Sequence, residues 1–265
     1  MKITLMEYHE FLPHPLLRNV VECYWSVRGN STGFWTVYPD ACMDILFNFG
    51  SFIETRNDKG NELSKNSAFV IGNMFTPIES RSVGVTDLFG IRFRAAGIGR
   101  ILRMPLHEFN DASLPLDSVY RFAPEAELLQ PLTMRERANM LDRWLLKQMN
   151  FSGKPEAWEL CLDAIVARQG NINVYDLARE VGISQKQMER KFVEKVGPTP
   201  KQFAQLLKFR KLRETLSAGK NDSLMNIAFD LDFVDHAHLT KFFKKFALIT
   251  PVITLTEGRC VATTR

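Results

Sequence analysis

The chain has 265 residues, of which 45% are hydrophobic and 24% are charged, the balance of an ordinary globular protein with one or two domains. No stretch of about 18 apolar residues is present, which argues against a membrane-spanning helix. The N-terminus lacks the apolar segment of a signal peptide, and the four cysteines lie far apart without a CxxC pair. We therefore expect a cytoplasmic protein with reduced thiols.

Charge is distributed unevenly along the chain. Residues 153–265 contain 18 basic and 13 acidic side chains, a balance of +5, whereas residues 1–152 contain 16 and 17, a balance of −1. Residues 184–213 contain nine basic side chains and only two acidic ones, Glu189 and Glu194. A local basic excess suits a polyphosphate partner because each neutralised phosphate releases counterions. A charged run is also typical of a solvated helix surface.

The first hundred residues contain short segments rich in aromatic and β-branched residues, separated by Gly, Asn, Asp and Ser. Segments of this kind and spacing are typical of the strands of a β-barrel or a sandwich. The predicted strands are Cys23–Val27, Trp35–Tyr38, Ile45–Phe49, Phe69–Ile71 and Leu88–Phe93.

After Ala96 the pattern becomes helical. Ile98–Met104 predicts a short helix that ends before Pro105, and Thr133–Met149 predicts a longer one with apolar residues three or four apart. The segment Phe151–Pro155 breaks the pattern. It is the predicted boundary between an N-terminal domain, residues 1–152, and a C-terminal domain, residues 153–265, whose helices are joined by short turns.

A helix-turn-helix pattern occurs in the C-terminal domain. The helix Val174–Val181 is followed by a turn at Gly182 and a second helix, Ser184–Val196. Asn173 and Ser184 are suitable N-cap residues for these two helices. Glycine at the turn supplies a left-handed backbone conformation without a steric penalty.

The same pattern recurs about fifty residues later, after a long amphipathic helix at Pro200–Ser217. A duplicated pattern in register is a stronger signal than one helix-turn-helix match. The corresponding residues are Ala178 and Ala228, Gly182 and Asp232, Met188 and Leu239, Arg190 and Lys241, Phe192 and Phe243, and Thr199-Pro200 and Thr250-Pro251.

The segments LAREVGISQKQMERKFVEKVGPTPKQF and IAFDLDFVDHAHLTKFFKKFALITP resemble the DNA-binding domain of the AraC/XylS family. The resemblance covers about residues 158–252. It implies two recognition helices in successive major-groove segments on one face of the DNA, which recur about 34 Å apart. Asp232 and Leu248 depart from the family pattern, which usually has Gly at both positions. The chain after Pro251 lacks the family's usual ending, and we expect a loosely ordered tail there.

The N-terminal domain resembles an uncharacterised β-rich domain often found ahead of AraC-type domains. The segments VVECYWSV, YPDACMDILFNFG, FGIRFRAAGIGRIL and PLHEFND carry this resemblance, which covers about residues 8–120. It implies a sensory or oligomerisation module and names no ligand.

Together these features predict an α+β protein. A β-rich, barrel-like (cupin-like) domain with trailing helices precedes an all-α domain with two helix-turn-helix units joined by a long helix. The predicted function is sequence-specific DNA binding that regulates transcription, controlled through the N-terminal domain by a small-molecule effector or by self-association.

Direct readout of DNA needs side chains on the exposed N-terminal part of each recognition helix. Arg190 and Lys241 are favoured because they occupy matching positions of the repeat, although any single polar side chain here is also typical of a solvated surface. The predicted DNA contacts are Ser184, Gln185, Lys186, Gln187, Glu189, Arg190, Asp235, His236, Ala237, Thr240 and Lys241. The residues predicted to contact phosphates, or else to be plain surface, are Lys191, Lys195, Lys201, Lys244 and Lys245.

A ligand site in the N-terminal domain is less well located. Arg92 and Arg94 share one face if Ile91–Phe93 is a strand, and would hold an anionic effector. The favoured alternative is that one of these arginines pairs with Asp40 or Asp44 while the tryptophans fill the core. The candidate effector-binding residues are Arg92, Arg94, Trp25, Trp35 and Tyr38.

We expect no metal and no cofactor, because His9, His14 and His107 all lie outside the predicted strands. We also expect no enzyme, because Cys23 and Cys42 have no adjacent histidine to activate a nucleophile. One enzymatic alternative is a methyl-accepting cysteine, as in DNA-repair proteins that also carry an AraC-type domain. A constitutive DNA binder without a ligand is the other alternative.

Two DNA-binding domains on one site raise the effective concentration, so we expect a homodimer formed through residues 1–152. The candidate interface is the helix Thr133–Met149, with Trp144 facing a partner. The favoured alternative is that its apolar stripe packs on the domain's own sheet. The stripe comprises Met134, Ala138, Leu141, Leu145 and Met149.

Overall fold

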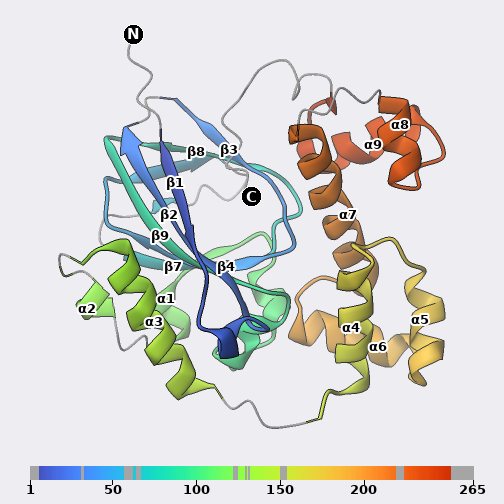
Figure 1. Ribbon diagram of the computed structural model, residues 1–265, viewed down its shortest axis with the longest axis horizontal. Coiled ribbons are helices and arrows are strands. Elements are labelled where there is room, and N and C mark those ends of the chain that lie inside the picture. Colours follow the sequence, from blue (N-terminus) through green and yellow to red (C-terminus); the bar gives the residue numbers. More distant parts are fainter. Residues whose placement is uncertain are drawn as a thin grey trace.

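A computed structural model describes residues 6–30, 33–56, 62–63, 67–121, 125–128, 130, 132–149, 154–218 and 224–251. A β-rich N-terminal part lies beside a helical C-terminal part (Figure 1). No helix among the described residues is long and apolar enough to cross a membrane.

Two open antiparallel sheets form the N-terminal part. The first has the strand order β1-β2-β9-β4-β7-β10, and the second has the order β3-β8-β5-β6. Neither sheet closes into a barrel in the described part of the chain, although two open sheets remain consistent with a cupin-like fold. The strands are β1 (Glu7–Phe11), β2 (Val21–Asn30), β3 (Trp35–Val37), β4 (Met43–Asn48), β5 (Ile53–Arg56), β6 (Glu62–Leu63), β7 (Ser67–Ile71), β8 (Ile78–Ser82), β9 (Val85–Phe93) and β10 (Ser113–Pro115).

The sequence predicted the apolar strands and missed the polar or very short ones. β1, β5 and β8 have the sequences EYHEF, IETR and IESRS, while β6 and β10 span two and three residues. Backbone pairing with other strands holds such strands, so their own hydrophobicity gives little signal. His9, which we expected outside the strands, consequently lies in β1.

The central strands β4 and β9 are buried on both faces. Phe89 and Ile91 face a large core covered by the helices that follow β9. Leu46 and Leu88 face the second sheet in a smaller core. Side chains alternate along a strand, so Arg92 shares the face of Leu88 and points between the two sheets.

The helices take up most of the chain after β9. The segment predicted as the helix Ile98–Met104 forms only one turn of 3₁₀ helix, η2, whose first residue Gly97 lies against the carbonyl of Val20. The α-helices are α1 (Leu116–Val119), α2 (Glu125–Leu128), α3 (Met134–Gln148), α4 (Ala157–Ala167), α5 (Val174–Val181), α6 (Gln185–Lys195), α7 (Pro200–Ser217), α8 (Leu224–Asp230) and α9 (His236–Ala247). The 3₁₀ helices are η1 (Pro15–Leu17), η2 (Gly97–Arg100) and η3 (Leu106–Phe109).

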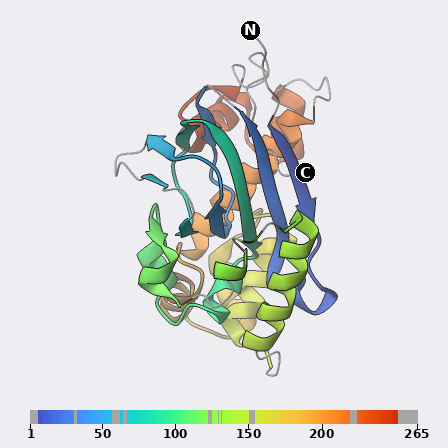
Figure 2. The ribbon, with the colours of Figure 1, turned by 90° about the vertical axis from the view of Figure 1, so that its left-hand side faces the viewer.

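Helix α3 covers one face of the larger sheet (Figure 2). A capping box between Thr133 and Glu136 fixes its start. Leu141 and Leu145 are fully buried in the core of the same chain. Trp144 is also buried and packs edge-on against Tyr120, with ring centroids 6.0 Å apart. The favoured packing on the domain's own sheet is therefore confirmed, and the expectation that Trp144 faces a partner is wrong.

Helix α7 forms the axis of the C-terminal part (Figure 1). Its side chains are buried around its circumference, because α4–α6 pack near its first turns, α8 and α9 near its last, and the N-terminal part along its side. Tyr38 and Ala41 belong to the same core cluster as the C-terminal helices, and the rings of Tyr38 and Phe209 lie 6.5 Å apart. Residues of the N-terminal part thus contribute to the core of the C-terminal helices.

Three expectations fall on residues that are not described. Most of the predicted boundary segment Phe151–Pro155 lies outside the described residues, and so do Gly219, which we expected to end the helix Pro200–Ser217, and the tail after Pro251. The division at residue 152 remains a prediction.

Candidate functional site

The first helix-turn-helix unit consists of α5 and α6. The Asn173 side chain caps α5 by accepting a hydrogen bond from the Tyr175 amide at 3.1 Å. Helix α5 ends at Gly182, where φ is +79°, and the Ile183 amide donates to the Ala178 carbonyl at 3.0 Å. The left-handed glycine and this backbone bond reverse the chain direction between the two helices.

Helix α6 begins with the predicted capping box. The Gln187 amide donates to Ser184 Oγ at 3.2 Å, and the Ser184 amide donates to Gln187 Oε1 at 3.0 Å. Met188 and Phe192 are buried beneath the helix. The remaining predicted contacts on its first turns, Gln185, Lys186, Glu189 and Arg190, are exposed together with the two capping residues.

The second unit, α8 and α9, repeats this geometry. The Phe233 amide donates to the Ala228 carbonyl at 2.8 Å, the counterpart of the bond in the first unit. The Asp235 carboxylate caps α9 by accepting from the His238 amide at 2.7 Å. Leu239 is buried like Met188. Of the predicted contacts on α9, His236, Ala237 and Lys241 are exposed and Thr240 is half-buried.

The two departures from glycine adopt the conformation that glycine would favour. Asp232 has φ +52° and Leu248 has φ +60°. The Asp232 carboxylate accepts a hydrogen bond from the Asn171 amide group, which links the two units. Leu248 is 60% exposed, so its side chain gains little packing in return for the strained backbone.

Several of the predicted phosphate contacts have partners within the chain. Lys191 pairs with Glu156 at 2.9 Å, Lys195 pairs with Glu194 at 2.8 Å, and Lys245 donates to Gln205 at 2.9 Å. To contact DNA, each of these three lysines would have to exchange its internal partner for a phosphate. The other two, Lys201 and Lys244, are exposed.

Arg190 and Lys241 form no ion pair with any described residue. Both are exposed on the second turn of their helices. Their charges are therefore free to meet an external anion, and the matching positions of the repeat make them the leading candidates for DNA contacts.

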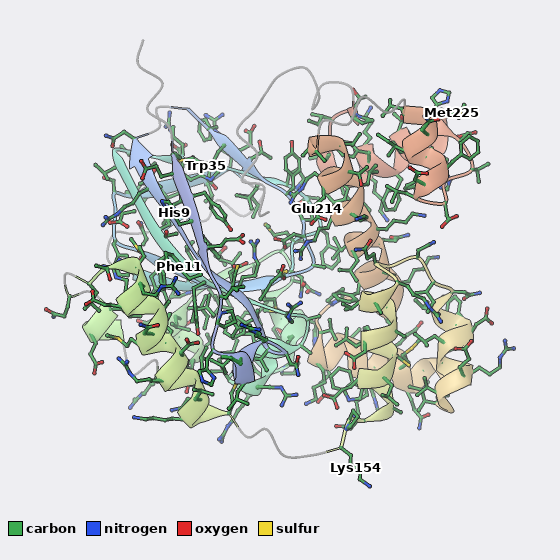
Figure 3. All side chains as sticks on the ribbon, in the orientation of Figure 1. His9, Phe11, Trp35, Lys154, Glu214 and Met225 are labelled. Atoms are coloured by element: carbon green, nitrogen blue, oxygen red, sulfur yellow. The ribbon has the colours of Figure 1, made fainter. Side chains whose placement is uncertain are left out.

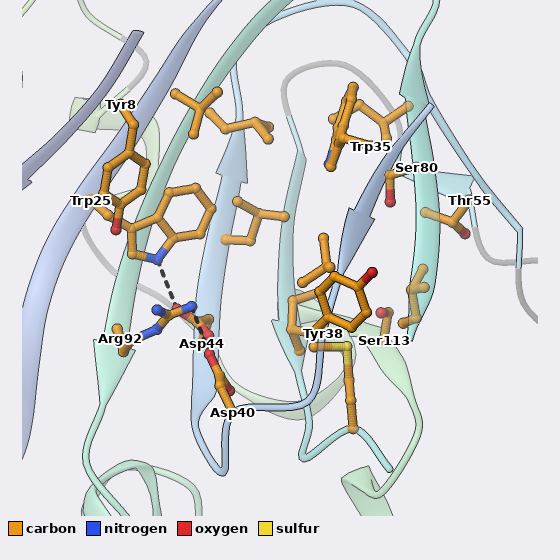
Figure 4. Close-up of a pocket in the computed structure, with 18 of the residues that line it drawn as sticks. Tyr8, Trp25, Trp35, Tyr38, Asp40, Asp44, Thr55, Ser80, Arg92 and Ser113 are labelled. Carbon is orange, nitrogen blue, oxygen red and sulfur yellow. Dashed lines mark hydrogen bonds and ion pairs between the residues drawn. The ribbon is translucent and has the colours of Figure 1, made fainter. Parts of the chain in front are cut away.

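A cavity of about 310 Å³ lies between the two sheets (Figure 4). Trp25, Trp35, Tyr38 and Arg92, four of the five predicted effector residues, line it. Arg94 does not, because it follows the end of β9, is exposed and donates to the Arg18 carbonyl at 2.7 Å. The expectation that both arginines serve one site is therefore not met.

Arg92 is held by two carboxylates at the floor of the cavity (Figure 4). Its Nη2 lies 3.1 Å from Asp40 Oδ2, and its Nε lies 3.3 Å from Asp44 Oδ1. Trp25 Nε1 donates to the same oxygen of Asp44 at 2.7 Å. Burial disfavours the Arg92 charge, but the two carboxylates outweigh burial and raise its pKa. The pairing in the favoured alternative is confirmed, whereas Trp25 and Trp35 are half-buried and line the cavity instead of filling the core.

Arg213 of α7 also lines the cavity, and sequence reasoning missed it. It is only 3% exposed, and its Nε has no hydrogen-bond partner among the described residues. Burial lowers the pKa of its guanidinium. The signal in the sequence is an arginine flanked at helical spacing by Phe209, Leu212 and Leu216, which places a cation on a buried face.

Comparisons with known proteins identify two regions. Residues 177–256 match a helix-turn-helix domain, and residues 9–115 match a domain of unknown function, DUF6597. The C-terminal part is an AraC-type DNA-binding domain. Among curated proteins, none matches the sequence.

Two solved structures of ToxT share the two-part fold. ToxT from Vibrio cholerae superposes with a TM-score of 0.52 at 11% identity, covering 88% of this chain and 97% of ToxT. ToxT from the O395 strain, bound to (E)-4-(8-methylnaphthalen-1-yl)but-3-enoic acid, gives 0.51 at 12% identity, covering 88% and 98%. An AraC-type regulator from Chromobacterium violaceum gives 0.35 at 21% identity, covering 40% of this chain and 95% of its own.

The N-terminal part holds the AraC-type domain at the end of α6. The Val196 carbonyl accepts from Asn73 Nδ2 at 2.9 Å, and the Gly197 carbonyl accepts from Asn110 Nδ2 at 3.0 Å. These bonds fix the C-terminal end of the first recognition helix and leave its N-terminal turns exposed.

An ion pair joins the N-terminal part to α7 of the AraC-type domain. A bulge in β2 interrupts its pairing with β9 between Val21 and Cys23, and Glu22 lies at this irregularity. Its carboxylate meets Arg210, with Nη2 2.5 Å from Oε1, and Arg210 Nε also lies 3.0 Å from Glu214. Figure 3 shows Glu214 on the side of α7 that faces the N-terminal part. Sequence reasoning missed this pair because a bulge leaves no clear sequence signal.

The cysteines give no support to the methyl-acceptor alternative. Cys23, Cys42 and Cys161 are buried, and burial raises the pKa of each thiol, for Cys23 to about 12. A thiol of this kind is a poor nucleophile because little thiolate forms at neutral pH. Cys260 lies outside the described residues, within which no cluster of three potential metal ligands occurs.

Proposed function

We propose that the protein regulates transcription by sequence-specific binding to double-stranded DNA, and that a small-molecule effector in the N-terminal cavity controls this binding. The observation that carries the proposal is the pair of matched helix N-termini that α7 joins. Each presents exposed polar side chains on a capped helix, with its apolar residues turned inward.

The charge of the recognition helices supports DNA as the partner. Arg190 and Lys241 occupy corresponding positions and have no internal ion pair among the described residues. An exposed arginine on a recognition helix pairs with guanine through two hydrogen bonds, whereas lysine acts as a point charge toward guanine or phosphate. Lys186 adds a further exposed charge on α6.

Two features support effector control. The cavity is lined mostly by apolar and aromatic side chains with a few polar groups, as small-molecule sites generally are. It also includes Arg213 of α7 in its wall, so a ligand would contact the helix between the two DNA-binding units. ToxT, which shares the fold, binds a naphthyl-substituted carboxylic acid.

A selection from random duplex DNA tests the DNA-binding proposal. We expect an enriched site with two elements about one helical turn apart, because the two units follow one DNA face. The logarithm of the affinity should fall steeply with the logarithm of the salt concentration. Arg190→Gln should weaken binding to the selected site, whereas Arg143→Gln, an exposed arginine on α3, is the matched control.

Two results would contradict the proposal: no enriched sequence, or a salt slope near zero. Self-association through residues 1–152 also remains a proposal, and α3 is no longer its candidate interface. Light scattering with and without the selected DNA measures the oligomeric state directly.

A further inference from the structure

Four charged side chains line the cavity between the sheets: Asp40, Asp44, Arg92 and Arg213. Both carboxylates form ion pairs with Arg92, as described above, although Arg92 Nε and Nη1 have no hydrogen-bond partner among the described residues. Asp40 also accepts a hydrogen bond from the Cys42 amide at 3.0 Å. The cation that sequence reasoning would assign to a ligand, Arg92, is thus already neutralised within the protein.

Arg213 differs from Arg92 in forming no ion pair. It forms no ion pair with any described residue, its Nε has no hydrogen-bond partner among them, and its guanidinium lies 5.6 Å from the centre of the Tyr38 ring. The charge of Asp40 favours the Arg213 guanidinium, but burial outweighs it, because the guanidinium has lost its water without gaining an opposite charge at ion-pair distance. A carboxylate in the cavity would supply that charge through two parallel hydrogen bonds.

The cavity walls define the rest of the ligand. Tyr8 and Trp25 are stacked on one side, and Trp35 and Tyr38 stand on the other (Figure 4). Flat aromatic walls favour a flat apolar body that stacks between them. The two carboxylates on the floor disfavour a second negative charge on the ligand, since like charges at short range repel.

Resting on the proposed effector control, we infer that the cavity binds a flat apolar monocarboxylate whose carboxylate pairs with Arg213. The ligand would then span the two sheets and α7. Arg210, one turn before Arg213 on α7, already forms an ion pair with Glu22 of the N-terminal part. Arg213 lacks such a pair, and the carboxylate of the ligand would supply it. Occupancy should therefore strengthen the attachment of α7 to the N-terminal part.

Naphthalene-2-carboxylate and its neutral analogue 2-naphthylmethanol test this inference on the full chain. Calorimetric titration should show at least tenfold tighter binding of the carboxylate to the wild-type protein. Arg213→Met keeps an unbranched side chain of similar length without the charge, and should remove this preference while still binding the alcohol. Lys211→Gln, on the same helix but outside the cavity lining, should keep the preference.

A second measurement does not depend on the probes. Arg213→Met should raise the melting temperature of the unliganded protein, because it removes an unpaired buried charge. Equal affinity for both probes, no binding of either at millimolar concentration, or an unchanged preference in Arg213→Met would overturn the inference. DNA binding is measured in the same samples without probe. If the probe tests fail while the protein binds DNA, only this inference fails. If the wild-type protein does not bind DNA, the proposed function fails.

Discussion

The ion pair between Glu22 and Arg210 should hold the two parts of the protein together, and a double-mutant cycle can measure its strength. The pair has two contacts, Nη2 to Oε1 at 2.5 Å and Nη1 to Oε2 at 3.3 Å. The two side chains are 22% and 20% exposed. Exposed pairs contribute about 0.2–1 kcal/mol, and breaking a fully buried pair costs about 3–5 kcal/mol. This mostly buried, two-contact pair should lie between these limits, at about 2 kcal/mol.

The cycle compares the wild type with Glu22→Gln, Arg210→Gln and the double variant in urea unfolding. The coupling term reports on the pair together with Cys42, whose Sγ lies 3.4 Å from both Glu22 Oε2 and Arg210 Nη1, whereas the separate contact of Arg210 with Glu214 is lost in both variants that lack Arg210. Tryptophan fluorescence reports on both parts, because Trp25 lies in the N-terminal part and Trp158 on α4. A coupling energy below about 0.5 kcal/mol would refute the view that this contact fastens the two parts.

The same variants predict a dependence on pH. Burial opposes the charge of Glu22, but the hydrogen bond and the charge of Arg210 outweigh it, so the pKa of Glu22 is lowered from its ordinary value of 4.5. A carboxyl with a depressed folded-state pKa contributes stability above the ordinary pKa and loses it as the pH falls through the folded-state value. The difference in unfolding free energy between wild type and Glu22→Gln should therefore be constant near neutral pH and shrink below pH 4.5. A difference that grows toward acid pH would show that the sign is wrong.

Three further predictions concern α3, the second helix-turn-helix unit and the recognition helix. Leu141→Glu and Trp144→Glu should each cost more than about 3 kcal/mol and abolish the near-ultraviolet circular dichroism, because both bury a charge in the core; a folded monomer from either change would contradict this. Leu248→Gly should raise the unfolding free energy by about 0.5–1 kcal/mol by relieving its left-handed backbone, whereas Leu248→Ala keeps its Cβ and should give no gain. Arg190→Gln should reduce discrimination between selected and random DNA by about 1–3 kcal/mol. Lys191→Gln removes a lysine already paired with Glu156 and should reduce binding of both DNAs by less than about 1 kcal/mol. Equal losses from both changes, measured by fluorescence anisotropy, would show that Arg190 contacts only phosphate.

The sequence by itself determined the features that depend on residues close together along the chain. The capping box of Ser184 and Gln187, the left-handed turn at Gly182 and the buried position of Met188 are all local consequences of residue type and spacing. The second unit follows from the same rules, with Asp235 as the cap. A repeat of such signals identifies the DNA-binding domain, because each helix-turn-helix unit is specified within about twenty residues.

The central strands were also predictable, because burial on both faces makes them apolar throughout. The polar strands β1, β5 and β8 were not, since their stability comes from pairing with partners elsewhere in the chain. The sequence pattern also placed Arg92 and Arg94 together, whereas β9 ends between them and separates their surroundings.

Only the tertiary structure decided which charges are free and which are already paired. Arg92 meets Asp40 and Asp44 because β4 and β9 are neighbours in the sheet, which no local spacing reveals. Glu22 reaches Arg210 through a bulge, across 188 positions of the chain. Arg213 enters the cavity of the N-terminal part because α7 packs against it. Electrostatic pairing depends on distance in space, and folding brings together charges whose separation along the chain carries no information about their contact.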